Sequence, residues 1–311
     1  MPNPTASDAP PSRRPVLSTV ERELDTLKDG MTVALGGFNT ASHPMAVVRG
    51  IVRRGLRNLR VVGSAIAGLD LDLLIGAGAV REVVTSSVTA EVLAATGPFF
   101  RHALERQQIN LWECDEGIFY AALRAAGQGL PFAPWKAGIG TSILQLNPDL
   151  KIFPCPITGQ DLIAVPAIVP DVFFAHVERA DRYGLGQHTG SGYGDRALHR
   201  ASRRTVLTTE ALVSNEEIRR NPMMTSIAYA DAVIRVPWGA HPFASPGCYR
   251  VDEAFIRQYV DVANRARKGD RSAFDAWLQR YVHGPKSQAD YLGTVGFDAW
   301  HDLQDVTEKE S

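Results

Sequence analysis

Small, hydroxyl, acidic and imidazole side chains stand directly after apolar runs at several points along this 311-residue chain. These points are Gly36-Gly37-Phe38, Gly63-Ser64, Glu113, Glu210 and Gly239-Ala240-His241. Each run is typical of a buried strand, and in an open α/β sheet ligands bind outside the carboxyl ends of the strands. We therefore predict a site at this edge, with Glu113 and His241 as catalytic candidates and Gly36, Gly37, Phe38, Ser64 and Gly239 as binding residues.

The stretch Met31 to Pro44, MTVALGGFNTASHP, has the clearest local signal. Two adjacent glycines let the backbone take a positive φ and let another group approach it closely. Amides freed there and at the start of the following helix could hold an anion or a thioester oxygen. The other interpretation is an ordinary tight turn between a strand and a helix.

The remaining candidates each have two interpretations. Glu113 follows Ile109, Leu111 and Trp112, which predicts a carboxylate at the rim of an apolar surface, able to act as acid, base or hydrogen-bond acceptor. It could equally be an acid that favours a helix dipole, as Asp115 could. Ser64 could hydrogen-bond an acyl group or cap a helix. His241 could polarise a substrate, or be a loop histidine with no role.

Many common catalytic signatures are missing. The sequence has no G-x-S-x-G, H-E-x-x-H, C-x-x-C or P-loop motif. The glycine-rich run GLGQHTGSGYG, residues 184–194, matches neither G-x-G-x-x-G nor the P-loop, and we interpret it as a flexible connection. The three cysteines, Cys114, Cys155 and Cys248, are too scattered for a disulfide framework or a zinc cluster, so we predict no metal site and a reducing cytoplasm.

Composition excludes several classes of partner. Lys+Arg 33 against Asp+Glu 34 gives a net charge of -1, so nothing points to nucleic acid or an acidic membrane surface. No apolar run approaches the roughly 20 residues that a membrane span needs. The N-terminus places Pro, Ser and Asp where a secretory signal would have its apolar core. We expect residues 1–15 to be a disordered tail and the protein to be cytoplasmic.

Alternating strand and helix patterns place the candidate residues on one sheet. Helices are predicted over 16–28, from Met45, and over 70–75, 98–107, 116–128, 252–268 and 271–281; strands are predicted over 31–35, 59–62, 80–86, 109–112, 160–165, 172–177, 205–209 and 231–236. Repeated βαβ units mean a mostly parallel sheet with helices on both faces.

Other segments of the chain carry separate expectations. Arg49, Arg53 and Arg54 are predicted to face solvent. The Pro/Gly-rich stretch LPFAPWKAGIGTSILQLNP is expected to be irregular and functional. The main domain is expected to be 16–283, with 284–311 peripheral.

Several motifs, in their order and spacing, resemble the A subunits of the family I coenzyme A transferases, of the glutaconate and 3-oxoadipate type. The resemblance covers Val16 to Tyr281. It rests on Asp29-Gly30 before the Gly-Gly-Phe strand end, Asp72 to Gly78, Leu130-Pro131-Phe132, Asn147-Pro148, Cys155-Pro156 with Thr158-Gly159, Ala164 to Ala167 with Pro170-Asp171-Val172, His176 with Ala180-Asp181, and Gly239 to Pro242.

This resemblance implies a three-layer α/β/α fold and a homologous B subunit, in a heterodimer or an α2β2 assembly. It implies no permanently bound cofactor, a coenzyme A thioester as substrate, and a ping-pong reaction through an acyl-glutamyl anhydride and a glutamyl-CoA thioester. In this family the glutamate belongs to the B subunit, in a Ser-Glu-Asn-Gly-like setting. Here Asp115-Glu116-Gly117 does not match that setting, so the nucleophile is expected from the partner.

Two alternatives accompany the transferase prediction. A related branch in sterol-ring breakdown hydrolyses a ring or a C–C bond of a diketone acyl-CoA, and there a glutamate at a position like Glu113 takes the catalytic part. The run Glu113 to Gly117 resembles that branch, whereas CPITGQDLIAVPAI resembles the oxoadipate branch, and we favour the transferase. A ligand-sensing regulator would need a DNA-binding element, which neither the charge nor the N-terminal tail provides.

Overall fold

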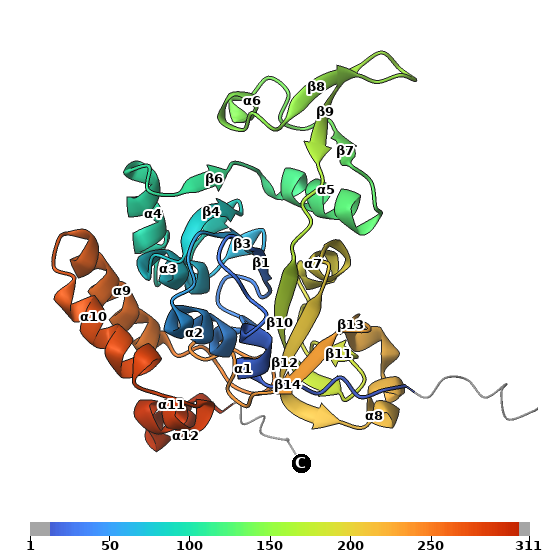
Figure 1. Cartoon of the computed structure of the whole chain (residues 1–311). Helices are drawn as coiled ribbons and strands as arrows, with labels where there is room; N and C mark the ends of the chain where they lie inside the picture. The colour runs from blue at the N-terminus through green and yellow to red at the C-terminus, as the bar shows by residue number, and fades with distance from the viewer. Residues whose placement is uncertain (1–12, 305–311) are drawn as a thin grey trace, which may run out of the picture.

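A large sheet forms the middle of the protein in a computed structural model that describes residues 13–304 (Figure 1). Within that range the sheet has nine strands. Its parallel part runs in the order β6–β4–β2–β1–β10–β12–β14, and β11 and β13 add antiparallel beside β10. The strands are β1 (Thr32–Leu35), β2 (Leu59–Val62), β4 (Val80–Val84), β6 (Asn110–Trp112), β10 (Val172–Asp181), β11 (Gly186–Gln187), β12 (Thr205–Val213), β13 (Thr225–Ile227) and β14 (Ala232–Arg235).

Helices cover both faces of this sheet, which confirms the predicted mostly parallel α/β fold (Figure 1). One face is covered by α2 (Met45–Arg54), α3 (Leu69–Gly76), α4 (Pro98–Glu105), α9 (Glu253–Arg267) and α10 (Ser272–Leu278). The other is covered by α5 (Glu116–Gly127) and α7 (Asp195–Ala201). The smaller elements are α1 (Val20–Leu24), α8 (Asn215–Arg220), α11 (Gln288–Val295), α12 (Phe297–Leu303), a 3-10 helix (Pro222–Met224), a π-helix (Gln279–His283), and a paired β3 (Ile66–Ala67) and β5 (Ser87–Val88).

Successive residues of each strand pack into two separate hydrophobic cores, one on each face of the sheet. Val33 and Leu35 pack with the α2 and α3 side, whereas Ala34 between them packs with the α5 side. Phe174 and Phe173 divide in the same way, and all five side chains are fully buried. A parallel sheet covered on both faces requires apolar residues on both sides of each strand, which is why these strands read as continuous apolar runs.

The N-terminal helix is shorter than predicted. It begins at Val20 because the Thr19 side chain caps it, accepting from the N–H of Arg22 at 3.2 Å. Ahead of the cap the chain is paired instead with the sheet, where Ser18 N donates to the Val233 carbonyl at 2.9 Å. Most of the predicted disordered tail, residues 1–12, lies outside the described residues.

Residues 130–168 form a projection that we call the arm (Figure 1). It holds β7 (Phe132–Trp135), α6 (Ile143–Leu146), β8 (Lys151–Pro154) and β9 (Asp161–Pro166), with an antiparallel sheet in the order β7–β9–β8. The expectation of an irregular stretch after Gln128 is therefore wrong. Pro134 is accommodated because β7 is an edge strand, where a missing N–H need not break the ladder.

Two other expectations also fail because of burial. Arg49 is 3% exposed, donates to the His241 carbonyl at 2.9 Å and lies 3.6 Å above the Tyr291 ring. Tyr291 belongs to α11, in the segment expected to be peripheral, yet it is 2% exposed. Trp300 of α12 packs on Trp238 with ring centroids 4.7 Å apart. The C-terminal helices therefore hold the loop that follows β14.

Candidate active site

The Gly36-Gly37 turn at the end of β1 requires glycine at both positions. Gly37 has a φ of +92°, and a Cβ there would lie 2.7 Å from the Ala41 carbonyl oxygen and 2.9 Å from His43. A Cβ on Gly36 would lie 2.7 Å from Oδ2 of Asp195. Close approach by other groups therefore explains both glycines.

The amides of this turn are already engaged. Gly37 N donates to Asp195 Oδ1 at 3.0 Å, and the N–H groups of Gly36 and Phe38 donate to backbone carbonyls at 2.8 and 2.9 Å. The first N–H groups of α2, from Met45 to Val48, also donate to backbone carbonyls. The sequence pointed to free amides that could hold an anion, and the structure instead gives a tightly shaped wall.

The glycine-rich segment 184–194 packs against this turn and is no loose connection. It contains β11, and Asp195 follows it directly as the first residue of α7. The Tyr193 ring stacks on Phe38 with centroids 4.7 Å apart and planes 7° from parallel. The interpretation of a flexible connection is therefore wrong, and the segment forms a second wall beside the Gly36-Gly37 turn.

Buried ionisable groups lie between the Gly36-Gly37 turn and the glycine-rich segment. His188, Glu178 and Asp195 are each 3% exposed or less. His188 Nε2 lies 3.4 Å from Asp195 Oδ2, while its Nδ1 lies 2.6 Å from Ser226 Oγ. Burial lowers the pKa of His188, but the hydrogen-bonding and charge of Asp195 and the charge of Glu178 outweigh it, so the pKa is raised above its ordinary value.

A polar cavity of about 410 Å³ opens beside this segment. Its lining is His188, Thr189, Gly190, Ser191, Gly192, Tyr193, Arg196, Met223, Met224 and Ser226. Arg196 is an exposed cation there, next to Asp195, which is bonded to the turn. The sequence offered no basis for choosing a basic residue for a substrate carboxylate, and Arg196 carries the guanidinium among the residues that line this cavity.

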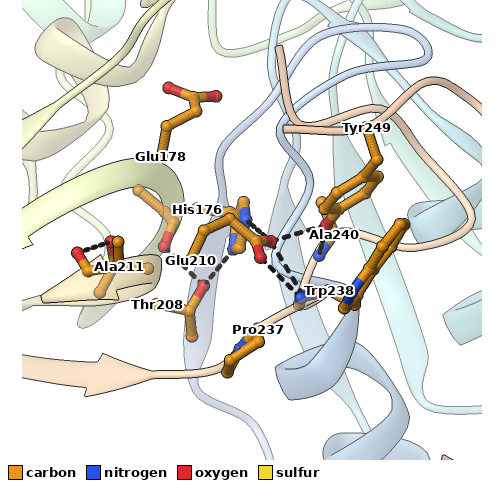
Figure 2. A network of polar contacts seen from close by, with 12 residues as sticks. His176, Glu178, Thr208, Glu210, Ala211, Pro237, Trp238, Ala240 and Tyr249 are labelled. Carbon is orange, nitrogen blue, oxygen red and sulfur yellow. Dashed lines mark hydrogen bonds and ion pairs between the residues drawn. The ribbon is translucent and has the colours of Figure 1, made fainter. Parts of the chain in front are cut away.

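Glu210 was expected directly after a strand but lies within β12, which continues to Val213, and donors from several directions hold its carboxylate (Figure 2). Its carboxylate accepts from His176 Nε2 at 2.8 Å and from the Tyr249 hydroxyl at 2.7 Å. The N–H groups of Trp238 and Gly239 add bonds of 2.6 and 3.2 Å. Burial would raise the pKa of Glu210, but His176 and Tyr249 outweigh it and lower the pKa. This carboxylate anchors the loop that carries Gly239.

His241 lies behind that loop and is fully buried. Its Nδ1 is 2.7 Å from the Tyr291 hydroxyl and its Nε2 is 3.1 Å from Asp252 Oδ2. Burial lowers the pKa of His241, against the opposing effect of Asp252. Since both ring nitrogens have partners, we do not place His241 among the groups that touch a substrate.

The hydroxyl of Ser64 is also engaged in a hydrogen bond. The residue is 1% exposed, and its hydroxyl donates to the Ile66 carbonyl at 2.6 Å. It caps no helix, because α3 begins after Gly68. Its backbone carbonyl in turn accepts from the Thr85 hydroxyl at 2.8 Å. Ser64 therefore shapes the loop between β2 and β3 beneath the rim.

Glu113 is different, because its carboxylate makes no hydrogen bond or ion pair with any residue of the described range 13–304. The side chain is half-buried at the end of β6. Asp115 takes the capping role at α5, accepting from Ile118 N at 2.7 Å. Glu113 lies three strands from Gly36, roughly 14 Å at the usual strand spacing.

The structure thus gathers Gly36, Gly37 and Phe38 with Asp195 and His188, bonds the Gly239 carbonyl to the start of α2, and leaves Glu113 three strands away. Sequence reasoning missed Asp195 and His188, although His188 lies within the glycine-rich run and Asp195 directly follows it. No group of three or more His, Cys, Asp or Glu in residues 13–304 is arranged to hold a metal ion. Among the same residues, no helix is long and apolar enough to cross a membrane.

The comparisons with known proteins agree on one family for this chain. The model of the coenzyme A transferase family matches residues 17–236. The chain is 34% identical to the A subunit of 3-oxoadipate CoA-transferase from Pseudomonas knackmussii, over 86% of this chain and 94% of that protein. It is 32% identical to the cholesterol ring-cleaving hydrolase IpdA subunit of Mycobacterium tuberculosis, over 92% of this chain and 97% of that protein.

A solved structure agrees with the fold. Glutaconate coenzyme A-transferase from Acidaminococcus fermentans superimposes with a TM-score of 0.86 at 28% identity, covering 94% of this chain and 96% of that one. The chain spans 62% of the length of an uncharacterised Archaeoglobus fulgidus relative, with which it shares 34% identity.

Proposed function

Since the chain belongs to the coenzyme A transferase family, we propose that it is the A subunit of a heteromeric CoA transferase. It moves CoA from an acyl-CoA donor to a short 3-oxo or dicarboxylic acid. A homologous B subunit supplies the nucleophilic glutamate, in a heterodimer or an α2β2 assembly. The coenzyme A thioester is a substrate rather than a resident cofactor, and the enzyme works in the cytoplasm.

The proposed reaction splits one transfer into two symmetrical halves. The partner's glutamate carboxylate attacks the thioester carbonyl and expels CoA thiolate, which leaves an acyl-glutamyl anhydride. The thiolate then attacks the glutamyl carbonyl of the anhydride and releases the donor acid as its carboxylate. The acceptor carboxylate reverses both steps on the glutamyl-CoA thioester, so no water and no net proton are consumed.

This chain's part is to shape and orient the site. The Gly36-Gly37 turn packs closely on Asp195 and His43 and forms a fixed wall, and the stacked Phe38 and Tyr193 rings add an apolar surface beside it. Arg196 in the neighbouring cavity pairs with the acid's carboxylate. These roles need no nucleophile from this chain.

One observation carries the proposal: hydrogen bonds hold both Asp195 beside the turn and Glu210 on β12. Asp195 is bonded to Gly37 N, and Glu210 has four donors. The test is inactivation of the co-expressed A and B chains by hydroxylamine or borohydride, with and without acyl-CoA. A transferase loses activity only when acyl-CoA is present. Full activity after treatment contradicts a covalent glutamyl intermediate.

The alternative function is a CoA-dependent hydrolase that opens a ring or cleaves a C–C bond in a diketone acyl-CoA. The unpartnered carboxylate of Glu113 favours it, since such a group is available as an acid or base at the strand end. Under this alternative Glu113→Gln abolishes turnover and the trapping reagents have no effect. Under the transferase proposal the Glu113→Gln enzyme stays active and is still inactivated by the trapping reagents when acyl-CoA is present.

A further inference from the structure

The arm, residues 130–168, holds a larger share of the exposed large apolar side chains than its length would predict. Ile157 at the tip of the β8–β9 hairpin is 91% exposed and Leu146 of α6 is 61% exposed. The exposed large apolar side chains of the arm are Leu130, Phe132, Ile139, Leu146, Ile152 and Ile157. Exposed apolar side chains gathered on one projecting segment are typical of an interaction site.

Charged residues are correspondingly scarce on the arm. Its charged side chains are Lys136, Asp149, Lys151 and Asp161, which cancel, whereas 22% of the whole chain is charged. The cores of protein interfaces are depleted of charge in the same way. The arm is therefore suited to contact with an apolar protein surface and not to an ionic ligand.

One face of the arm's sheet has no cover in residues 13–304. Ile163 and Val165 of β9 point toward α5 and are fully buried. Phe132 and Phe153 lie on the opposite face, where their rings meet edge to face at 5.6 Å across the intervening β9. A three-stranded antiparallel sheet normally exposes polar residues on its free face, and this one exposes aromatic rings.

The arm adjoins the same edge, or rim, of the sheet as the candidate site, at the end of β6 and three strands from Gly36. Asn147 of the arm donates to the Glu113 carbonyl at 2.8 Å, and Trp112 Nε1 donates to Asp149 Oδ2 at 3.0 Å. A partner whose carboxylate must come within about 3 Å of a reacting carbonyl has to cover that rim. Its body then reaches the surface that adjoins the rim.

We propose that the arm is the docking surface for the B subunit. The identity of this occupant rests on the proposed function. The apolar face around Phe132 and Phe153 and the projecting Leu146 and Ile157 pack on the partner and bring its glutamate over the strand ends. A single surface then serves both assembly and completion of the active site.

The test measures association of the full chain with the B chain of the same genome, tagged and immobilised. Leu146→Asp and Ile157→Asp change exposed side chains, so the fold should be retained, with unchanged thermal midpoints. The matched control is Phe297→Asp, 78% exposed on α12 and remote from the arm (Figure 1). Each arm variant should bind at least about tenfold more weakly, and the control should bind as the parent does.

Two results would overturn the inference. One is parental affinity for both arm variants. The other is a chain that dimerises by itself in sedimentation experiments, becomes monomeric on either arm substitution and still binds the B chain normally. An assembly that depends on the arm but transfers no CoA would contradict the proposed function and leave the docking surface standing. An active assembly whose affinity is unchanged by the arm substitutions would contradict the docking surface and leave the proposed function standing.

Discussion

Gly37 offers the sharpest test of the wall beside the strand ends, because the same strand supplies its own control. Gly30, just before β1, has a φ of +82° and nothing within 4 Å of a built Cβ. Gly37 has a φ of +92° and would place its Cβ 2.7 Å from the Ala41 carbonyl oxygen. Gly30→Ala therefore reports the backbone penalty alone, and Gly37→Ala reports that penalty plus a collision.

The two effects have separable sizes. A positive φ costs an alanine about 1–2 kcal/mol, and overpacking at a tight site costs about 1–3 kcal/mol more. The free energy of unfolding should fall by about 1–2 kcal/mol in Gly30→Ala and by about 2–5 kcal/mol in Gly37→Ala. Native proteins have about 5–15 kcal/mol in all, so Gly30→Ala stays folded, and Gly37→Ala stays folded when the parent's stability exceeds its larger loss.

Urea unfolding followed by circular dichroism measures the stabilities, and CoA transfer by the assembled A and B chains measures function. A displaced turn loses its bond to Asp195 and moves the wall, for which a drop of roughly 100-fold in rate is expected. Gly30→Ala should retain the parental rate. Equal stability and equal rate for the two variants would refute the argument that close approach fixes this turn.

Three further predictions concern buried groups. Asp72 is fully buried, and burial raises its pKa from 3.8 to about 6, so its favourable contribution is present below pH 4 and is lost as the pH rises to 6. Relative to the parent, Asp72→Asn should therefore gain about 2–3 kcal/mol between pH 4 and 7 in urea titrations, and parallel pH curves would contradict this. His188 has a raised pKa, so its contribution to the stability of the fold is present below about pH 6.5 and is lost as the pH rises through the raised value. The thermal midpoints of the parent and of His188→Gln should therefore converge between about pH 6 and alkaline pH. A constant difference between the two midpoints would contradict this prediction. Tyr249→Phe removes a donor to Glu210 and the acceptor of Ala240 N, and should cost about 1–3 kcal/mol in urea unfolding, against no change if these bonds are dispensable.

The sheet could be predicted from sequence because its strands are covered on both faces. Runs such as Val33 to Leu35 and Val172 to Ala175 are apolar at successive positions, which is the pattern of a strand buried on both faces. The arm was not predicted because its β7 strand is short and contains Pro134. Proline usually indicates a break in regular structure, but it is tolerated in an edge strand such as β7.

Site residues were harder to predict for a physical reason. Residue types showed which side chains stand at strand ends, but not which of them already have partners. His241 and Ser64 looked available and are engaged by groups distant in sequence or locally by backbone. Arg49 interrupts the apolar face of α2, and its charge is accommodated by the Tyr291 ring and the His241 carbonyl, both far away along the chain.

Peptide mapping of the assembled enzyme tests the central claim most directly. The A and B chains are incubated together with acyl-CoA, reduced with borohydride and digested, and mass spectrometry then locates the reduced glutamate. If this chain is the A subunit of a CoA transferase, the modification lies on the B chain and every glutamate here, Glu113 included, is unchanged. A reduced glutamate on this chain, or none on either chain in an enzyme that turns over, would contradict that assignment.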